Sequence, residues 1–475
     1  MKYWFLTIIF LSLAISTATG QHIGWLSDTV NLRILVSFFS QASLSGLNEK
    51  DYAYKTVQQL TSGIKIVDTA SIDKELTNAA ISYFSDIVYG NQEVRVPYNG
   101  INYYPACLNI RDSILTAMAE DQFATLPARL EPHNVMYMEL KEKIAVLENR
   151  KKFIFSPVTS DKLDTTNHPL IEKLFQLGIT DTPDYTIHED TLRNKLRLAQ
   201  GMFEMLEDGT LRPGILEELN ISVEKRLYEL KHALNTWRWL DCIQQEQPVI
   251  IVNIPAANLF YICKDSVLFY TRCIVGKAAT PSIPLASSVH EVILFPYWNV
   301  PRSIAVNELL PAIQSAPLDY LDYGNYQVLD KAGKVLDPST IKWQQLNSRN
   351  FPYTLRQLFG CDNSLGIIKL NFFSPYSTYL HDTPNKSYFM FNSRYFSHGC
   401  IRVEDVDSLA EMLEPALHPF LANAATKVCD LASDSGQLIF PLKHKIPLFI
   451  LYEVAWPDGK GKICFYDDVY NKIKL

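Results

Sequence analysis

The residues with the clearest potential for chemistry lie in one short stretch of the chain. His381 stands in the sequence YLHDTP, and Cys400 follows nineteen positions later in SHGCIRV. A thiol nucleophile needs a base that takes its proton and hydrogen-bond donors that stabilise an oxyanion. From spacing alone, a catalytic Cys/His pair and a buried thiol beside satisfied histidines are about equally good interpretations, because such local patterns do not transfer between families.

The neighbours of the cysteine favour the catalytic interpretation. Gly399 lacks a side chain and therefore lets a substrate approach the backbone closely. A helical pattern begins at Val406, and backbone amides that face the site could lower the pKa of the thiol and bind an oxyanion. A metal site built from Cys400 and the two histidines, His381 and His398, lacks a clear fourth ligand, so no metal is expected.

The elements that position these residues are predicted to be short strands. After residue 246 the apolar segments become short and rich in β-branched and aromatic residues. The predicted strands are 248–253, 259–262, 266–270, 271–275, 291–295, 367–373, 377–381, 448–454 and 463–466. Lys264-Asp265 and Asp458-Gly459 are predicted turns. A polar, partly helical stretch between Ser303 and Asn363 is expected to be an insertion.

The chain before residue 240 is predicted to be mainly helical. Val223, Leu227, Leu230, Leu234 and Trp237 recur at spacings of three and four, which predicts one buried helix face. The charged residues Glu224, Lys225, Glu229 and Lys231 are expected on the other face. Residues 192–220 are interpreted as helix, turn and helix, with the turn at 207–209.

Composition excludes several classes of function. The 475 residues are 47% hydrophobic and 20% charged, so the chain can bury sizeable cores. Lys and Arg number 44 against 51 Asp and Glu, a net charge of −7 without a basic block, which is unfavourable for nucleic-acid binding. A glycine-rich phosphate loop, a CxxC pair and an HExxH motif are absent from the sequence.

The amino-terminal residues predict export. Lys2 precedes an apolar run from Phe5 to Ile15, and small residues follow, with Ala18 and Gly20 suited to cleavage before Gln21. Without cleavage, the same run would act as an amino-terminal anchor.

Eight cysteines stand at 107, 242, 263, 273, 361, 400, 429 and 464. If Cys400 stays free an odd number remains, so mostly buried free thiols are expected, and their pairing cannot be deduced from sequence.

The two motifs together resemble the YkuD-type L,D-transpeptidases. Their signature is a histidine followed, after a gap, by [ST]HGC, an apolar residue and Asn or Arg. IVNIPAANLFYI, TRCIVGK, FPYWNVPRSIAVNELLP and IPLFILYEVAWPDGKGKICFYDDVY further resemble the large YcbB-like subfamily. The resemblance covers about 247–475 strongly. Asp208-Gly209 between two helices resembles, more faintly, a reduced peptidoglycan-binding repeat, and a plain helical scaffold is a comparable interpretation there.

The resemblance implies an α+β fold, with a mainly helical N-terminal scaffold followed by a β-rich YkuD-type catalytic domain with an inserted capping subdomain. The expected divisions are a signal peptide at 1–20, a helical scaffold domain at 21–165, a degenerate peptidoglycan-binding-like helical domain at 166–220, a linker helix at 221–246 and the catalytic domain at 247–475, with the capping insertion at about 303–363.

Residue roles follow from the same resemblance. Cys400 matches the family's nucleophile and His381 its general base, while Tyr379 matches a position that helps to shape the oxyanion site. The backbone amides of Gly399 and Cys400 are the expected main donors, and His398 is expected to support the site without reacting.

Substrate contacts are expected from a second set of residues, namely Trp298, Asn299, Arg302, Ser397 and Arg402. Trp298 could equally belong to the core, which is slightly favoured. Arg402 fits a substrate carboxylate and a structural ion pair equally well. Asp382 could orient His381, but a main-chain carbonyl often does so in this family.

The resemblance implies an exported enzyme of the periplasm or cell envelope that forms 3→3 cross-links between peptidoglycan stem peptides without metal or nucleotide. Carbapenem-type inhibitors would acylate Cys400, and other wall-synthesis enzymes are conceivable partners. Two alternatives stay open: an L,D-carboxypeptidase that uses water as acceptor, and a non-catalytic wall-binding scaffold protein.

Overall fold

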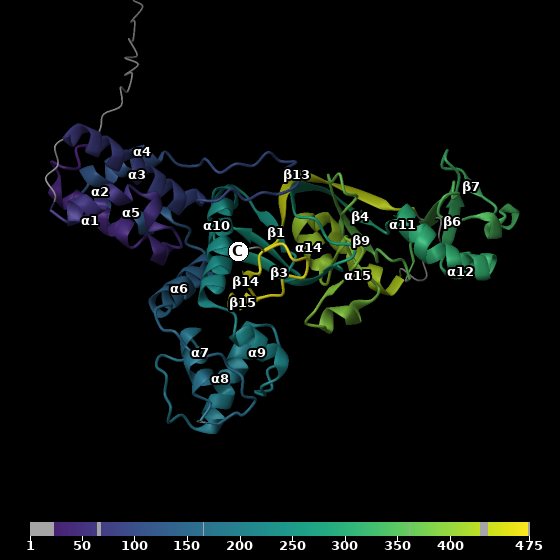
Figure 1. The fold of residues 1–475 in the computed structure, drawn as a ribbon. Coiled ribbons are helices and arrows are strands. Elements are labelled where there is room, and N and C mark those ends of the chain that lie inside the picture. Colours follow the sequence, from purple (N-terminus) through teal and green to yellow (C-terminus); the bar gives the residue numbers. More distant parts are fainter. Residues whose placement is uncertain (1–22, 64–67, 165, 361, 428–435, 474–475) are drawn as a thin grey trace, which may run out of the picture. The chain divides into compact units, whose positions relative to one another are not determined.

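The computed structural model describes residues 23–63, 68–164, 166–360, 362–427 and 436–473 (Figure 1). The predicted signal peptide therefore lies outside the described residues. The chain divides into two compact units. The first contains residues 48–85, 109–129 and the described residues up to Ala42; the second contains residues 43–47, 86–108 and everything from Leu130 onward. No helix among the described residues has the length and apolar character needed to cross a membrane.

The first unit is a helical bundle around an aromatic core. Its helices are α1 (Thr29–Ser40), α2 (Tyr54–Thr61), α3 (Thr69–Tyr89, whose last turn belongs to the second unit), α4 (Ile110–Ala119) and α5 (Leu126–Leu130). The side chains of Asp28 and Asn109 accept backbone N–H bonds at the starts of α1 and α4, which satisfies donors that have no partner within the helix. Trp25, Phe39 and Phe84 are almost fully buried between these helices.

The second unit begins with helices that lead to its β-rich part. These are α6 (Val135–Arg150), α7 (His168–Gln176), α8 (Glu189–Met202), α9 (Pro213–Leu219) and α10 (Val223–Glu246). The predicted apolar face of α10 is buried as expected, and the ring of Trp237 stacks on that of Trp456, with centroids 5.0 Å apart. Glu229, expected on the polar face, is instead buried and pairs with Arg226 at 3.1 Å, because α10 is packed on more than one side.

The predicted turn between α8 and α9 is present. Gly209 adopts a φ of +72°, and the Asp208 carboxylate accepts bonds from the amide and hydroxyl of Thr210. These bonds lower the pKa of Asp208 to about 2. Peptidoglycan binding by residues 166–220 stays a prediction.

Nine strands of the described residues form one sheet in the order β11-β3-β12-β10-β9-β4-β13-β1-β2. Because β2 pairs with both β1 and β3, the sheet closes on itself like a barrel. The strands are β1 (Val249–Asn253), β2 (Asn258–Cys263), β3 (Ser266–Gly276), β4 (Leu285–Leu294), β9 (Ile368–Phe372), β10 (Leu380–His381), β11 (Tyr395–Ser397), β12 (Ile401–Val403) and β13 (Leu438–Leu451). After β12 come α14 (Val406–Leu413) and α15 (His418–Lys427), and β14 (Ala455–Pro457) pairs with β15 (Ile463–Phe465).

Most predicted strands are present, but several bounds differ, β4 starts six residues before the predicted 291, and β11 and β12 were not predicted. The segments 266–270 and 271–275 form the single strand β3. The predicted strand 377–381 shortens to the two residues of β10, since Ser377 has a φ of +52°, outside the β region. β13 starts ten residues before the predicted 448, and its first half escaped prediction because it is mostly exposed and contains the polar run 443–445.

The predicted insertion carries its own small sheet and core. The strands β8 (Thr354–Gln357), β6 (Tyr326–Leu329) and β7 (Val335–Leu336) pair in that order, beside α11 (Arg302–Ile304), α12 (Leu310–Ser315) and α13 (Pro317–Tyr323). The sheet begins with β5 (Trp298–Asn299), which pairs with β8 and precedes the predicted start of the insertion. Ile313, Leu355 and Trp343 are buried at its centre. The β strands were not expected here, because they are short and interrupted by polar turns. A capping role stays a prediction.

The expected fold class is confirmed: a helical amino-terminal region precedes a β-rich domain with mixed helical content. Most of the described cysteines are free, as expected, although only Cys273 and Cys464 of the free thiols are buried. Cys107 and Cys242 form a disulfide, while Cys263, Cys273, Cys400 and Cys464 are free. Cys361 and Cys429 lie outside the described residues.

Candidate active site

Three neighbouring strands place a histidine between two cations. His381 of β10 lies directly opposite Arg402 on the parallel strand β12 and opposite Lys369 on the antiparallel strand β9. Residues in one cross-strand row project from the same face of a sheet. The adjoining row, Leu370, Leu380 and Ile401, is completely buried in the core on the other face.

Burial and charge keep His381 neutral. Its side chain is almost fully buried, and its Nδ1 donates to the main-chain carbonyl of Asp382 at 2.5 Å. Burial first, and then the positive charge of Arg402, lower the pKa of the imidazole to about 3, although the carbonyls of Asp382 and Leu365 act in the opposite direction. With Nδ1 donating, Nε2 is the free base.

The carboxylate of Asp382 does not orient the histidine. Its Oδ2 accepts from the amide of Ile367 at 2.9 Å, and its Oδ1 lies 2.7 Å from Nζ of Lys386. The main-chain carbonyl of Asp382 makes the contact with His381 instead. This geometry agrees with the expectation that a main-chain carbonyl, and not the Asp382 carboxylate, orients His381.

A tight turn between β11 and β12 holds Cys400. Gly399 adopts a φ of +107°, which a side chain would strain, and a Cβ there would meet the Pro281 carbonyl at 3.3 Å. The hydroxyl of Ser397 donates to the carbonyl of Cys400 at 2.5 Å and accepts from the amide of Gly399 at 3.1 Å. Ser397 is buried, so it shapes this turn; a substrate contact by its hydroxyl stays a prediction.

The turn leaves one backbone donor available for an oxyanion. The expected pair was Gly399 and Cys400, but the amide of Gly399 is already bonded to Ser397. Among the described residues, the amide of Cys400 has no acceptor. Cys400 itself is therefore the backbone donor that this conformation offers, and a Gly399 contribution would require the Ser397 bond to break.

Tyr379 lies close enough to the nucleophile candidate to influence its charge. Burial raises the pKa of the Cys400 thiol, while the Tyr379 amide and hydroxyl, and the charges of Lys369 and Arg402, lower it. The Tyr379 hydroxyl also interacts with the Trp298 side chain. With a raised thiol pKa and a neutral His381, the resting pair is thiol and imidazole rather than thiolate and imidazolium.

A cavity of about 350 Å³ opens beside this tyrosine. Trp298, Asn299, Lys369 and Asn371 are among the residues that line it. Ser377, another lining residue, has its carbonyl 3.9 Å from Sγ of Cys400. Trp298 is both a cavity wall and a member of the insertion's core, so both interpretations of it apply.

His398 and Arg302 lie outside this cavity. Nε2 of His398 lies 2.8 Å from Oε1 of Glu308 in the insertion and 3.4 Å from Nζ of Lys277. Arg302 donates to the main-chain carbonyls of Phe351 and Ser348, within the insertion. The structure thus places His398 at a contact between the catalytic turn and the insertion, and leaves substrate binding by Arg302 as a prediction.

Arg402 lacks the structural ion pair that one interpretation required. Within the described parts of the chain it has no carboxylate partner, and its Nε is buried without a hydrogen-bond acceptor. Burial lowers the pKa of its guanidinium, and the charge of Cys400 opposes this. An unpaired, partly buried cation is favourable for binding an anionic substrate group.

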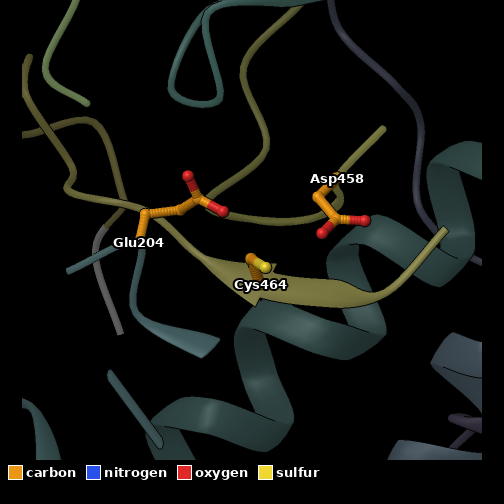
Figure 2. Close-up of side chains that lie close together, drawn as sticks. All are labelled: Glu204, Asp458 and Cys464. Carbon is orange, nitrogen blue, oxygen red and sulfur yellow. The ribbon is translucent and has the colours of Figure 1, made fainter. Parts of the chain in front are cut away.

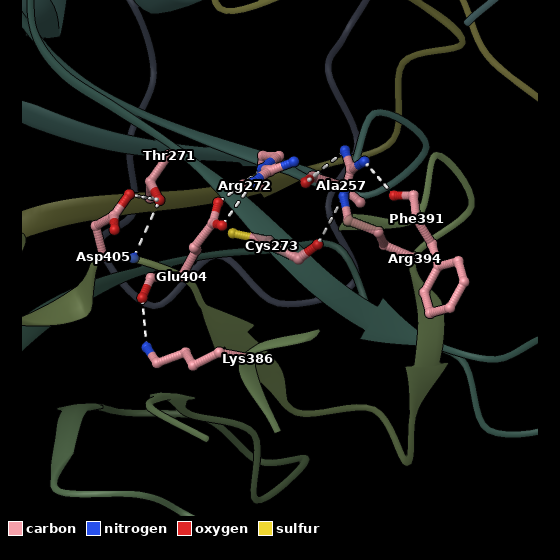
Figure 3. A network of polar contacts seen from close by, with 9 residues as sticks. All are labelled: Ala257, Thr271, Arg272, Cys273, Lys386, Phe391, Arg394, Glu404 and Asp405. Atoms are coloured by element: carbon pink, nitrogen blue, oxygen red, sulfur yellow. Dashed lines mark hydrogen bonds and ion pairs between the residues drawn. The ribbon is translucent and has the colours of Figure 1, made fainter. Parts of the chain in front are cut away.

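A polar network supports the loop before Cys400 (Figure 3). The buried Arg394 donates to five main-chain carbonyls, those of Ala256, Ala257, Cys273, Phe391 and Asn392. Nearby, Arg272 makes a bidentate pair with Glu404 at 2.6 and 2.7 Å. Sequence reasoning missed Arg394 because an isolated arginine in a polar loop carries no periodic pattern.

Glu204, Asp458 and Cys464 form a second group of side chains with metal-ligand chemistry (Figure 2). One Asp458 oxygen accepts from the amides of Lys460 and Lys462, and Sγ of Cys464 donates to the carbonyl of Gly201 at 3.6 Å. Burial raises the pKa of both Glu204 and Cys464. The contacts of Asp458 belong to a turn, and zinc usually takes four ligands, whereas this group offers three.

Comparisons with known proteins agree with the geometry. Residues 247–428 match the family model of the L,D-transpeptidase catalytic domain (YkuD), and residues 17–144 match that of a scaffold domain. Over 248 residues the chain is 34% identical to a Haemophilus influenzae protein named "Putative L,D-transpeptidase". The match covers 51% of this chain and 47% of that protein, so the chain spans about half the length of the curated relative it matches.

Proposed function

The chain carries the catalytic domain of the YkuD-type L,D-transpeptidases behind a scaffold domain, and from this premise we propose that it cross-links peptidoglycan stem peptides. Members of this family act on such stem peptides. The observation that carries the proposal is the placement of Cys400 beside Tyr379, with its own amide free and His381 neutral on the adjoining strand.

In the first half-reaction, Sγ of Cys400 attacks the carbonyl carbon of the third residue of a donor tetrapeptide. The thiol proton passes to His381, whose neutral form is the competent base. The amide of Cys400 and the hydroxyl of Tyr379 are the available donors for the oxyanion. The C–N bond then breaks, His381 returns the proton to the leaving amine of D-alanine, and a thioester remains.

In the second half-reaction, an amine of a neighbouring stem attacks the thioester carbon. His381 takes a proton from that amine, the C–S bond breaks, and Cys400 regains its proton. The product is a 3→3 cross-link. Trp298, Asn299 and Arg402 would contact the stems, since the first two line the cavity and the third is an unpaired cation opposite His381.

We place the enzyme in the cell envelope, as the amino-terminal residues predict. The Cys107–Cys242 disulfide supports this placement, because disulfides persist mainly in oxidising compartments.

The test is to incubate the protein with purified disaccharide-tetrapeptide and to follow the products by mass spectrometry. The expected product has the mass of two stems minus one D-alanine, and Cys400→Ala should not form it. Release of tripeptide alone would identify a carboxypeptidase. Absence of both products, together with absence of a carbapenem adduct on Cys400, would contradict catalysis and favour a wall-binding protein.

A further inference from the structure

We propose that Lys369 binds the free carboxylate at the carboxyl end of the donor stem and so selects stems that end one residue beyond the attacked bond. This inference rests on the proposed function. It assigns a specificity-determining role to a residue that neither the family comparison nor the sequence motif singles out.

Lys369 is a cation without a counterion. In the ranges that the structure covers, its Nζ makes no ion pair and no hydrogen bond, and lies 4.4 Å from the centre of the Tyr379 ring. The charge of Cys400, and then that of Glu291, raises its pKa, but neither group forms an ion pair with it, and Glu291 already accepts a bond from Asn371 at 2.6 Å. The positive charge is therefore free to pair with an anion from outside the chain.

The surroundings of Lys369 favour an anionic ligand. The side chain is half-buried, and burial lowers the pKa of its ammonium group. A cation that has lost part of its water gains more from a bound carboxylate than a fully exposed one does. Lys369 lines the 350 Å³ cavity together with Asn299 and Asn371, whose amides are polar groups suited to a peptide.

The position of Lys369 fits the end of a stem rather than its middle. Its Nζ lies over the ring of Tyr379, whose hydroxyl lowers the pKa of Cys400, and the charge of Cys400 acts on Lys369 itself. In a tetrapeptide, the terminal carboxylate belongs to the residue that directly follows the attacked carbonyl. Successive Cα atoms are about 3.8 Å apart, so each additional residue would place the carboxylate farther from the attacked carbonyl.

A different role for Lys369 is to lower the pKa of the Cys400 thiol by its charge alone. Both roles predict slower turnover without the lysine, so activity alone does not separate them. The two roles differ in how they depend on the terminal group of the ligand. Stabilisation of a thiolate does not depend on that group, whereas a carboxylate contact is lost when the carboxylate is converted to an amide.

The experiment measures binding in Cys400→Ala, which cannot react, by isothermal titration with disaccharide-tetrapeptide and with its carboxyl-terminal amide. We expect the free acid to bind at least about tenfold more tightly than the amide. Adding Lys369→Met should weaken binding of the acid to within about twofold of the amide and leave the amide unchanged. Lys369→Arg should keep part of the preference, and Lys55→Met, at an exposed lysine of the first unit, should keep all of it.

Equal binding of acid and amide to Cys400→Ala would overturn the proposal, as would equal losses for both ligands in the Lys369→Met variant or no binding of either. Failure of the proposed function looks different: the protein with Cys400 intact would turn over neither ligand, while the acid preference and its loss in Lys369→Met persisted. Thermal melting of each variant confirms that it is folded.

Discussion

His381 and Arg402 occupy the same position on neighbouring parallel strands, so that a neutral base and a permanent cation stand side by side. Lys369 completes the row on the other side. The cations disfavour an imidazolium at His381 and favour a thiolate at Cys400. One row of side chains thus biases both members of the proposed catalytic pair.

The depressed pKa of His381 predicts a loss of stability in acid. In the unfolded chain this histidine binds a proton below about pH 6.5, whereas in the folded chain it does so only near pH 3. Stability is therefore complete above about pH 6.5 and declines toward pH 3 by up to about 1.4 kcal/mol per pH unit. Urea unfolding followed between pH 4 and pH 8 should show this extra decline relative to His381→Gln. If the free energy of unfolding declined equally with falling pH in both proteins, the depressed pKa of His381 would be contradicted.

Removal of Arg402 should make the thiol less reactive. Its charge lowers the pKa of Cys400, so Arg402→Met raises that pKa and leaves less thiolate at neutral pH. We expect several-fold slower alkylation of Cys400 by iodoacetamide at pH 7.5, measured on the Cys400 peptide by mass spectrometry. Arg95→Met, at an exposed arginine, is the matched control. An unchanged rate in Arg402→Met would refute the electrostatic coupling.

Loss of the Tyr379 hydroxyl should slow turnover without unfolding the protein. The hydroxyl lowers the pKa of Cys400 and interacts with Trp298, so Tyr379→Phe removes a donor next to the developing charge. Hydrogen bonds to charged groups contribute about 1.5–3 kcal/mol, which corresponds to roughly a tenfold to hundredfold loss in kcat/KM. Tyr376→Phe alters an exposed tyrosine of the same segment and should retain activity. Comparable losses in both variants would count against a specific role.

Arg394 is expected to stabilise the catalytic turn. Arg394→Met would leave five buried or partly buried carbonyls without their donor, at a cost of about 1–3 kcal/mol for each carbonyl that stays unsatisfied. Arg394→Lys keeps the charge but cannot reach all five carbonyls, so its free energy of unfolding should lie between those of the unsubstituted protein and Arg394→Met. The measurement is the free energy of unfolding in urea, with the exposed Arg349→Met as control. A loss below about 1 kcal/mol in Arg394→Met would contradict this account.

The reactive pair could be predicted from sequence because its motif is contiguous, whereas its surroundings could not. Lys369 lies in a strand whose alternate residues, Ile368, Leu370 and Phe372, are buried, so its side chain could be assigned to the opposite face. Nothing in the sequence indicates that this face meets His381, because the pairing of β9 with β10 is set by contacts across the sheet. The Ser397 bond that occupies the Gly399 amide depends likewise on turn geometry.

The disulfide between Cys107 and Cys242 closes a covalent ring around much of the helical region. The exposed segments within that ring, such as residues 181–186, are where a protease would most readily cut. A single cut there divides the polypeptide but does not release either piece, since the sulfur bridge still joins them. The nicked protein would migrate as one species on a denaturing gel until a reductant separates its two fragments.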